Sequence, residues 1–254
     1  MRPAGAALPA LSAGIALLTW SALASRLPPV LLPSPAEVLA AGWRARETLG
    51  QAALSTGLSA LSGLGIATLG GLAGGVLFLR SRWLEAAFYP YALLIQTMPI
   101  VAVAPLLVVW LGYGRPVGVA AAAIASFFPV LTAVNVGLRS AEPEQVELLQ
   151  LYGASWLQTL WKLRFPASLP YVFAGLRVAG GLSVIGAIVG EFIGSNGQPP
   201  SLGYLVLRAA RTAETGLSLA AVLSATALSL LLYGVVRVAE RWVIGPWHAG
   251  GPPP

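Results

Sequence analysis

Few side chains in this chain could perform covalent chemistry. The 254 residues contain no cysteine and no aspartate, which excludes thiolate metal sites, cysteine nucleophiles and aspartyl-phosphate chemistry. The sequence also lacks a Gly-x-x-x-x-Gly-Lys-[Ser/Thr] loop, the motif that binds nucleotide phosphates. The single histidine, His248, has no partner nearby in the sequence, and we interpret it as a solvated or interfacial residue. The sequence therefore predicts neither a catalytic constellation nor an ATPase site.

The most informative spacing lies between residues 139 and 166. Residues 140–144 (Ser-Ala-Glu-Pro-Glu) are typical of a helix start, with a capping hydroxyl, an early proline and acids in the first turn. Gly153 then interrupts the helical pattern, and Ala154 and Ser155 lead into a second short helix. This pattern predicts a helix–turn–helix elbow outside the bilayer that contacts another molecule. A simple linker is the alternative, but it would not need such a turn.

Four polar residues lie within apolar segments or directly at the end of one, and they could line a pathway. Gln96 and Thr97 directly precede a Met-Pro pair, and a helix broken by proline at membrane depth is tolerated where it lines a cavity. Asn135 is a weaker candidate of the same kind. Glu191 could line the exit of a pathway, or it could form an interfacial ion pair with Arg208 or Arg211. For Gln96 and Thr97, a kinked helix that only packs against its neighbours is an equally good interpretation.

The elements that must position these residues are membrane helices. The chain is 57% hydrophobic and only 9% charged, which excludes disorder, a nucleic-acid-binding domain and a large soluble enzyme. Six apolar runs exceed the ~20 residues that a helix needs to cross a bilayer. We therefore predict an all-α, polytopic membrane protein with six transmembrane helices in a single domain, 1–254. Five runs carry no charge and the sixth carries only Arg177: 3–25, 48–79, 86–114, 116–138, 215–236 and 165–190.

The first run has a second interpretation. Residues 1–25 resemble a signal peptide that would be cleaved near Ser25, although the apolar stretch is longer than usual for one, and we favour a retained helix. The distribution of basic residues slightly favours a cytoplasmic N-terminus. Residues 36–47 are expected to form a short helix at the membrane interface. Arg177, within the sixth run, should face protein or water, or reach toward the cytoplasmic surface.

Small residues recur at every fourth position of the second run and would form one stripe on a helix. Such a stripe allows the backbone of another helix to approach closely. We favour packing within the chain over contact with a second copy. The residues are Ser55, Ser59, Gly63, Ala67, Gly71 and Gly75.

The elbow resembles the EAA loop of ABC importer permeases. That loop reads Glu-Ala-Ala, three residues, Gly, nine residues, Ile, one residue, Leu-Pro; Glu147, Gly153 and Pro166 match it in identity and spacing. Leucines replace both alanines, so the packing of the helix beneath the loop departs from the pattern. Further segments resemble the nitrate/sulfonate/taurine-type permeases over roughly residues 30 to 245. They include Gln96-Thr-Met-Pro99, Phe127-Phe-Pro129 and Gly175-Leu-Arg177.

This resemblance implies a type I ABC importer transmembrane domain (MetI-like) in the bacterial inner membrane. It implies a cytoplasmic coupling loop, 139–166, in which Glu147, Gly153, Ala154 and Ser155 contact a separate ABC ATPase. An extracytoplasmic substrate-binding protein and a second permease copy, forming a homodimer, are the other implied partners. No cofactor is implied, because the partner subunit binds the ATP.

The substrate and the transport class carry alternatives. The resemblance implies a small organic or anionic solute: a vitamin precursor such as hydroxymethylpyrimidine, riboflavin, or a sulfonate, taurine or nitrate. Several segments are closer to the pyrimidine-precursor and riboflavin branch. A secondary transporter or channel that works without an ATPase is the alternative class, but it would be expected to carry intramembrane acids or an internal repeat.

Overall fold

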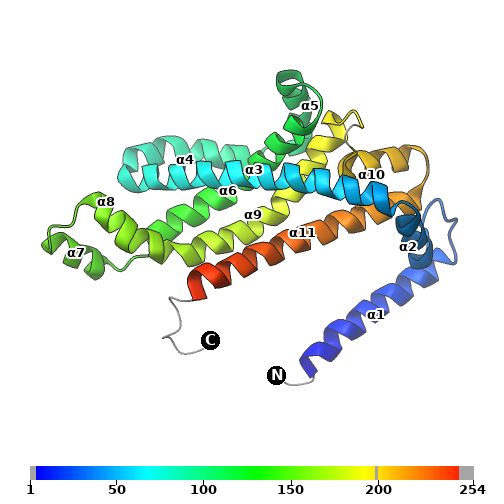
Figure 1. The fold of residues 1–254 in the computed structure, drawn as a ribbon, viewed down its shortest axis with the longest axis horizontal. Helices are drawn as coiled ribbons and strands as arrows, with labels where there is room; N and C mark the ends of the chain where they lie inside the picture. The colour runs from blue at the N-terminus through cyan, green and yellow to red at the C-terminus, as the bar shows by residue number, and fades with distance from the viewer. Residues whose placement is uncertain (1–3, 198–199, 246–254) are drawn as a thin grey trace.

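The computed structural model describes residues 4–197 and 200–245, and this part of the chain is helical with short connections (Figure 1). His248 lies outside the described residues. The helical segments are α1 (Ala4–Ala24), α2 (Pro35–Arg44), α3 (Arg46–Arg80), α4 (Arg82–Thr97), α5 (Ile100–Leu111), α6 (Arg115–Leu138), α7 (Pro143–Leu151), α8 (Trp156–Thr159), the π-helical turn η1 (Leu160–Arg164), α9 (Phe165–Gly194), α10 (Leu202–Arg211) and α11 (Thr215–Ile244).

Four long helices form the body of the molecule and run side by side in Figure 1. Helix α6 lies against both α3 and α9, and α11 packs on the other side of α9. The helices α3, α6 and α11 are long and apolar enough to cross a membrane, and so is the continuous helical segment Trp156–Gly194. Each helix presents an apolar surface, which can pack against another helix or face the lipid.

The small-residue stripe of α3 lies in the interface with α6. All six residues of the stripe are buried. A Cβ atom added at Gly71 would lie 2.7 Å from Val130 Cγ1 and 3.0 Å from the backbone nitrogen of Leu131. The stripe therefore brings two backbones of the same chain together, and the prediction of packing within the chain is confirmed.

Residues 86–114, expected as one span, form two helices. Helices α4 and α5 meet at an angle of 101° at the break after Thr97. Pro99 precedes α5 and cannot donate the hydrogen bond that would continue α4, whereas Pro90 and Pro105 lie inside helices. The break also changes the neighbours: α4 packs on α3 and α6, whereas α5 packs on α6 and α9.

The structure does not confirm the count of six spans. By length and composition the described residues contain four spans, or five if α4 and α5 are counted as one broken span. Helix α1 is 21 residues long, and it lies apart from the four long helices in Figure 1. The sixth span stays a prediction, as does the choice between a retained helix and a signal peptide.

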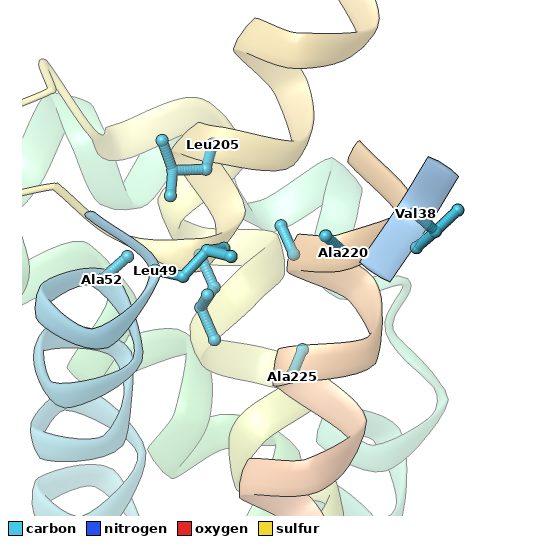
Figure 2. Packing of buried hydrophobic residues seen from close by; sticks show 8 residues of the cluster. Val38, Leu49, Ala52, Leu205, Ala220 and Ala225 are labelled. Atoms are coloured by element: carbon cyan, nitrogen blue, oxygen red, sulfur yellow. The ribbon is translucent and has the colours of Figure 1, made fainter. Parts of the chain in front are cut away.

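At one end of the bundle, two short helices are fastened by a cluster of buried apolar residues (Figure 2). Helix α2 begins with a capping box: Ser34 Oγ accepts from the Glu37 N–H, and the Glu37 carboxylate accepts from the Ser34 N–H at 2.7 Å. This confirms a short helix within residues 36–47. The cluster joins α2, α3, α10 and α11 and consists of Val38, Leu49, Ala52, Leu202, Leu205, Ala220, Ala221 and Ala225.

Candidate functional site: the elbow and the polar groups of the bundle

The segment after α6 folds as a helix–turn–helix elbow at the opposite end of the bundle from α2 and α10 (Figure 1). Its turn depends on Gly153, which has φ of +74°, a conformation that residues with a side chain, asparagine apart, rarely adopt. The Gly153 N–H donates to Gln150 O and the Ala154 N–H donates to Leu149 O, both at 2.9 Å. These bonds satisfy the last carbonyls of α7 and reverse the chain.

Ser155 starts the second helix of the elbow. Its Oγ accepts from the Gln158 N–H at 3.3 Å, and Gln158 Oε1 accepts from the Ser155 N–H at 2.7 Å. Helix α8 continues through η1 into α9, so the elbow is joined to a span without a break. The prediction that a hydroxyl caps the start of α7 is wrong. The N-cap of α7 is Glu142, and Ser140 Oγ donates to Gly137 O at 2.8 Å.

Contacts with the membrane helices hold the base of the elbow. Arg164 Nη1 donates to Leu138 O, the last residue of α6, at 3.1 Å. The Arg80 guanidinium at the end of α3 lies 5.8 Å from the centroid of the Trp156 ring, within the range of a cation–π interaction. Both ends of the elbow are thus attached to the ends of spans, and a force on the elbow would be passed to these helices.

The tip of the elbow, in contrast, has no cover. Helix α7 contains no buried residue. Leu151 and Tyr152 are 85% and 81% exposed, and Leu148 is 53% exposed. Large exposed apolar side chains on a segment outside the bundle are typical of a contact surface. We call Leu148, Leu151 and Tyr152 the elbow tip. Of the four predicted coupling residues, Glu147, Gly153 and Ser155 are exposed and Ala154 is half-buried, and all four lie between the start of α7 and the N-cap of α8.

Of the predicted pathway residues, Gln96 lies on the wall of a hollow of about 290 Å³. The hollow is bordered by the end of α4, the start of α5 and the middle of α6 and α9, with apolar side chains that include Ile100, Ile124 and Ile185. Thr97 is adjacent, and its hydroxyl donates to Leu94 O at 2.9 Å. The break between α4 and α5 therefore places a lone amide at the edge of an apolar chamber.

Asn135 does not line the hollow beside Gln96 and instead bonds to two charged side chains. Its Nδ2 donates to Glu85 Oε1 at 2.9 Å, and its Oδ1 accepts from Arg139 Nε at 3.2 Å. Glu85 and Arg139 also form an ion pair at 2.6 Å. The sequence analysis missed Glu85 and Arg139, because a separation of more than fifty residues leaves no local signal of their pairing.

Glu191 is buried, and its partners are not the predicted arginines. Its Oε2 accepts from Thr56 Oγ1 at 2.9 Å and from the Gly203 N–H at 3.1 Å. Thr56 Oγ1 accepts in turn from the Leu202 N–H at 2.9 Å. The carboxylate thus lies at the N-terminus of α10, where free N–H groups and the helix dipole favour negative charge. The predicted ion pair of Glu191 with Arg208 or Arg211 is therefore wrong, because the Thr56 hydroxyl and the Gly203 N–H at the start of α10 bind the carboxylate instead.

Arg177 forms an ion pair with Glu240, which joins α9 to α11. The side chains of this pair are 27% and 23% exposed, so the arginine that interrupts the sixth apolar run is compensated within the protein. Among the described residues, no group of three or more His or Glu side chains is placed to hold a metal ion.

The broken helix, the uncovered elbow and the apolar bundle define a membrane transport subunit, and its family is shown by comparison with known proteins. Residues 66–245 match the family "Binding-protein-dependent transport system inner membrane component", and the chain belongs to this family. It is an all-helical, multi-pass inner-membrane protein and the permease component of an ABC importer.

Three relatives span most of the chain. It is 35% identical to the "Probable ABC transporter permease protein" of Haemophilus influenzae, over 89% of this chain and 91% of the relative. It is 34% identical to the riboflavin transport system permease protein RibX of Chloroflexus aurantiacus, over 92% of this chain and 87% of the relative. It is 32% identical to the formylaminopyrimidine transport permease protein ThiX of Halalkalibacterium halodurans, over 87% of each chain. The predicted family resemblance is confirmed.

Proposed function

We propose that this permease is driven by a separate cytoplasmic ABC ATPase that binds the elbow, residues 139–166. The observation that carries the proposal is the contrast within the elbow: its base is bonded to α3 and α6, and its apolar tip is uncovered. A protein surface that buried this tip would gain roughly 1.5–3 kcal/mol for each large side chain. Glu147, Gly153, Ala154 and Ser155 would lie in the same interface.

We propose that the ATPase is a separate chain. This sequence has no phosphate-binding loop and no aspartate for magnesium, so P-loop ATP chemistry needs residues that it does not contain. An elbow attached to spans at both ends suits the transfer of movement from such a partner, since packed helices move as rigid bodies. An extracytoplasmic binding protein that delivers the substrate and a second permease copy complete the proposed importer.

Replacing Leu151 with glutamate should release the ATPase without unfolding the permease. Leu151 is 85% exposed, so the substitution removes no packing inside the chain. It places a charge in an apolar contact, and we expect the affinity for the co-expressed cognate ATPase to fall by about 10- to 100-fold. Co-purification from detergent measures this, with Glu144→Gln on the same helix as the control. Wild-type co-purification of Leu151→Glu would refute the docking surface.

We further propose that Gln96 and Thr97 border the translocation pathway. The hollow beside Gln96 is apolar, and a single amide at its edge could orient a planar polar solute by hydrogen bonds. Asn135 and Glu191 bond to partners inside the protein, so their contribution to the pathway would be to position the surrounding helices.

The substitution Gln96→Ala tests the pathway. We expect transport in proteoliposomes to fall by about 2- to 10-fold, the value of one hydrogen bond, with ATPase binding unchanged. Thr226→Val is the control, because the hydroxyl of this exposed threonine bonds only within α11. If Gln96→Ala transported at the wild-type rate, Gln96 would be a packing residue of a bent helix.

For the substrate, we propose a small heteroaromatic vitamin or vitamin precursor. Two relatives at 34% and 32% identity are named for riboflavin and formylaminopyrimidine transport, whereas a taurine transport permease of Escherichia coli is 27% identical. An apolar hollow with one amide suits a flat ring with polar edges better than a compact, fully hydrated anion. Hydroxymethylpyrimidine and riboflavin are therefore the first ligands to test, ahead of sulfonates, taurine and nitrate.

A further inference from the structure

A polar network joins three helix ends at the base of the elbow. Arg139 Nη2 donates to Glu85 Oε2 at 2.6 Å and to Phe78 O at 3.3 Å, while Arg139 Nε donates to Asn135 Oδ1 at 3.2 Å. Asn135 Nδ2 donates to Glu85 Oε1 at 2.9 Å, so both carboxylate oxygens are engaged. We call Glu85, Asn135 and Arg139 the relay triad.

Each member of the triad stands at a junction of the fold. Arg139 is the C-cap of α6 and the first residue of the elbow segment. Glu85 lies in the first turn of α4, whose last turn carries Gln96 and Thr97 beside the hollow. The triad therefore connects the start of the elbow to the start of the helix that ends at the proposed pathway.

Helix α4 has few other attachments. Its buried contacts form one aromatic cluster, in which Ala92 and the half-buried Tyr89 meet Phe78, Phe127 and Phe128. Much of its remaining surface is bare, with Trp83 at 88% exposure and Tyr91 at 64%. A helix held mainly by a polar joint at one end and an aromatic contact in the middle can pivot about the aromatic contact when the joint is moved.

We propose that the relay triad transmits movement of the elbow to α4 and so to the break at Met98 and Pro99. This rests on the proposed function, namely that an ATPase binds and moves the elbow. The triad suits the task because its charged groups are in direct contact, with Arg139 Nη2 2.6 Å from Glu85 Oε2, and because Asn135 between them is buried. The bridging amide also fixes the orientation of both charged groups, so the joint is stiff.

A purely structural role would predict a different result. If the triad only stabilised the turn between α3 and α4, breaking it would lower the folded yield and would leave the response of α4 to ATP intact in the molecules that fold. A relay predicts the reverse. The permease would fold and its partner ATPase would hydrolyse ATP normally, but the response at the far end of α4 would be lost.

The experiment uses the whole complex with its ATPase and exploits the absence of cysteine. Since the sequence contains none, Thr97→Cys provides a single thiol near the break. Its labelling rate by a maleimide is measured with and without ATP in three backgrounds: otherwise unchanged, Glu85→Gln, and the exchange Glu85→Arg with Arg139→Glu. Glu240→Gln, which breaks the Arg177–Glu240 pair between α9 and α11, is the matched control.

We expect ATP to change the labelling rate in the unchanged and Glu240→Gln backgrounds. In Glu85→Gln this change should be lost while ATPase co-purification and ATP hydrolysis persist, and the exchange should restore it. An ATP response in Glu85→Gln equal to the unchanged background would overturn the relay. If Glu85→Gln does not accumulate, Arg139→Lys replaces it, because lysine keeps the charge but has one donor nitrogen where arginine has three. Loss of the ATP response in this variant supports the relay, and an unchanged response overturns it.

The two proposals fail in distinguishable ways. If the unchanged complex does not retain its ATPase, or if ATP leaves its labelling rate unaltered, coupling through the elbow is wrong and the relay is wrong with it. If the unchanged complex responds and Glu85→Gln responds equally, coupling stands and only the relay is overturned.

Discussion

Gly153→Arg should abolish transport and leave the permease inserted and folded. At φ of +74° any side chain other than asparagine is strained by about 1–2 kcal/mol, which is local because a Cβ at this position would meet no atom within 4 Å. The long charged side chain would project beside the elbow tip and block the partner. The measurement is transport in proteoliposomes containing the whole importer, together with the amount of monodisperse permease extracted from membranes.

The control for this substitution is Gly153→Asn. Asparagine tolerates the left-handed conformation and is small, so most of the transport activity should remain. Full transport in Gly153→Arg would contradict the assignment of the elbow as the coupling contact. Loss of the folded protein, on the other hand, would mean that the turn stabilises the bundle, which its exposed position argues against.

Gly71→Leu should prevent the bundle from forming. The added Cβ would lie 2.7 Å from Val130 Cγ1 and 3.0 Å from the Leu131 backbone nitrogen, so α3 and α6 would have to separate. Overpacking of a close interface costs about 3 kcal/mol or more when backbone must move, a large share of the ~5–15 kcal/mol that stabilises a typical domain. We expect little monodisperse protein and a lowered thermal unfolding midpoint.

Gly65→Leu is the matched control for this effect. Gly65 lies on the same helix, and a Cβ there would meet nothing within 4 Å, so this variant should accumulate like the wild type. Size-exclusion chromatography of both variants completes the test. A Gly71→Leu permease that accumulates and unfolds like the wild type would contradict the close packing of α3 on α6 as a requirement for folding.

The elbow was predicted well because its structure is local. Its turn requires one glycine with positive φ, and its second helix is started by a serine and a glutamine three residues apart, which the sequence displays directly. The prediction that Ser140 caps α7 was wrong, because a serine hydroxyl near a helix start can either cap that helix or bond to the end of the preceding one. That hydroxyl bonds to Gly137 O at 2.8 Å and to Ala167 O at 3.3 Å, and the second of these contacts comes from another segment of the chain.

The break in residues 86–114 could be predicted only in part. Three prolines indicated an irregular helix, but each one only removes a donor, and the packing decides whether the helix kinks or breaks. At Pro90 and Pro105 the helix continues, whereas before Pro99 it turns by 101° because α4 and α5 bind different neighbours. The hollow beside Gln96 follows from that turn and could not be located from the spacing of prolines.

By itself, the sequence determined the membrane class, the family, the small-residue stripe and the elbow, since apolar length, residue size and local hydrogen bonding act over a few residues. The tertiary structure alone decided which groups meet across the bundle: Glu191 with Thr56 and α10, Arg177 with Glu240, and Glu85 with Asn135 and Arg139. These partners are separated by fifty residues or more in the chain, except for Glu191 with Gly203 and for Asn135 with Arg139. A polar side chain in an apolar bundle must find a partner, but only the packing of the helices determines which partner comes within reach.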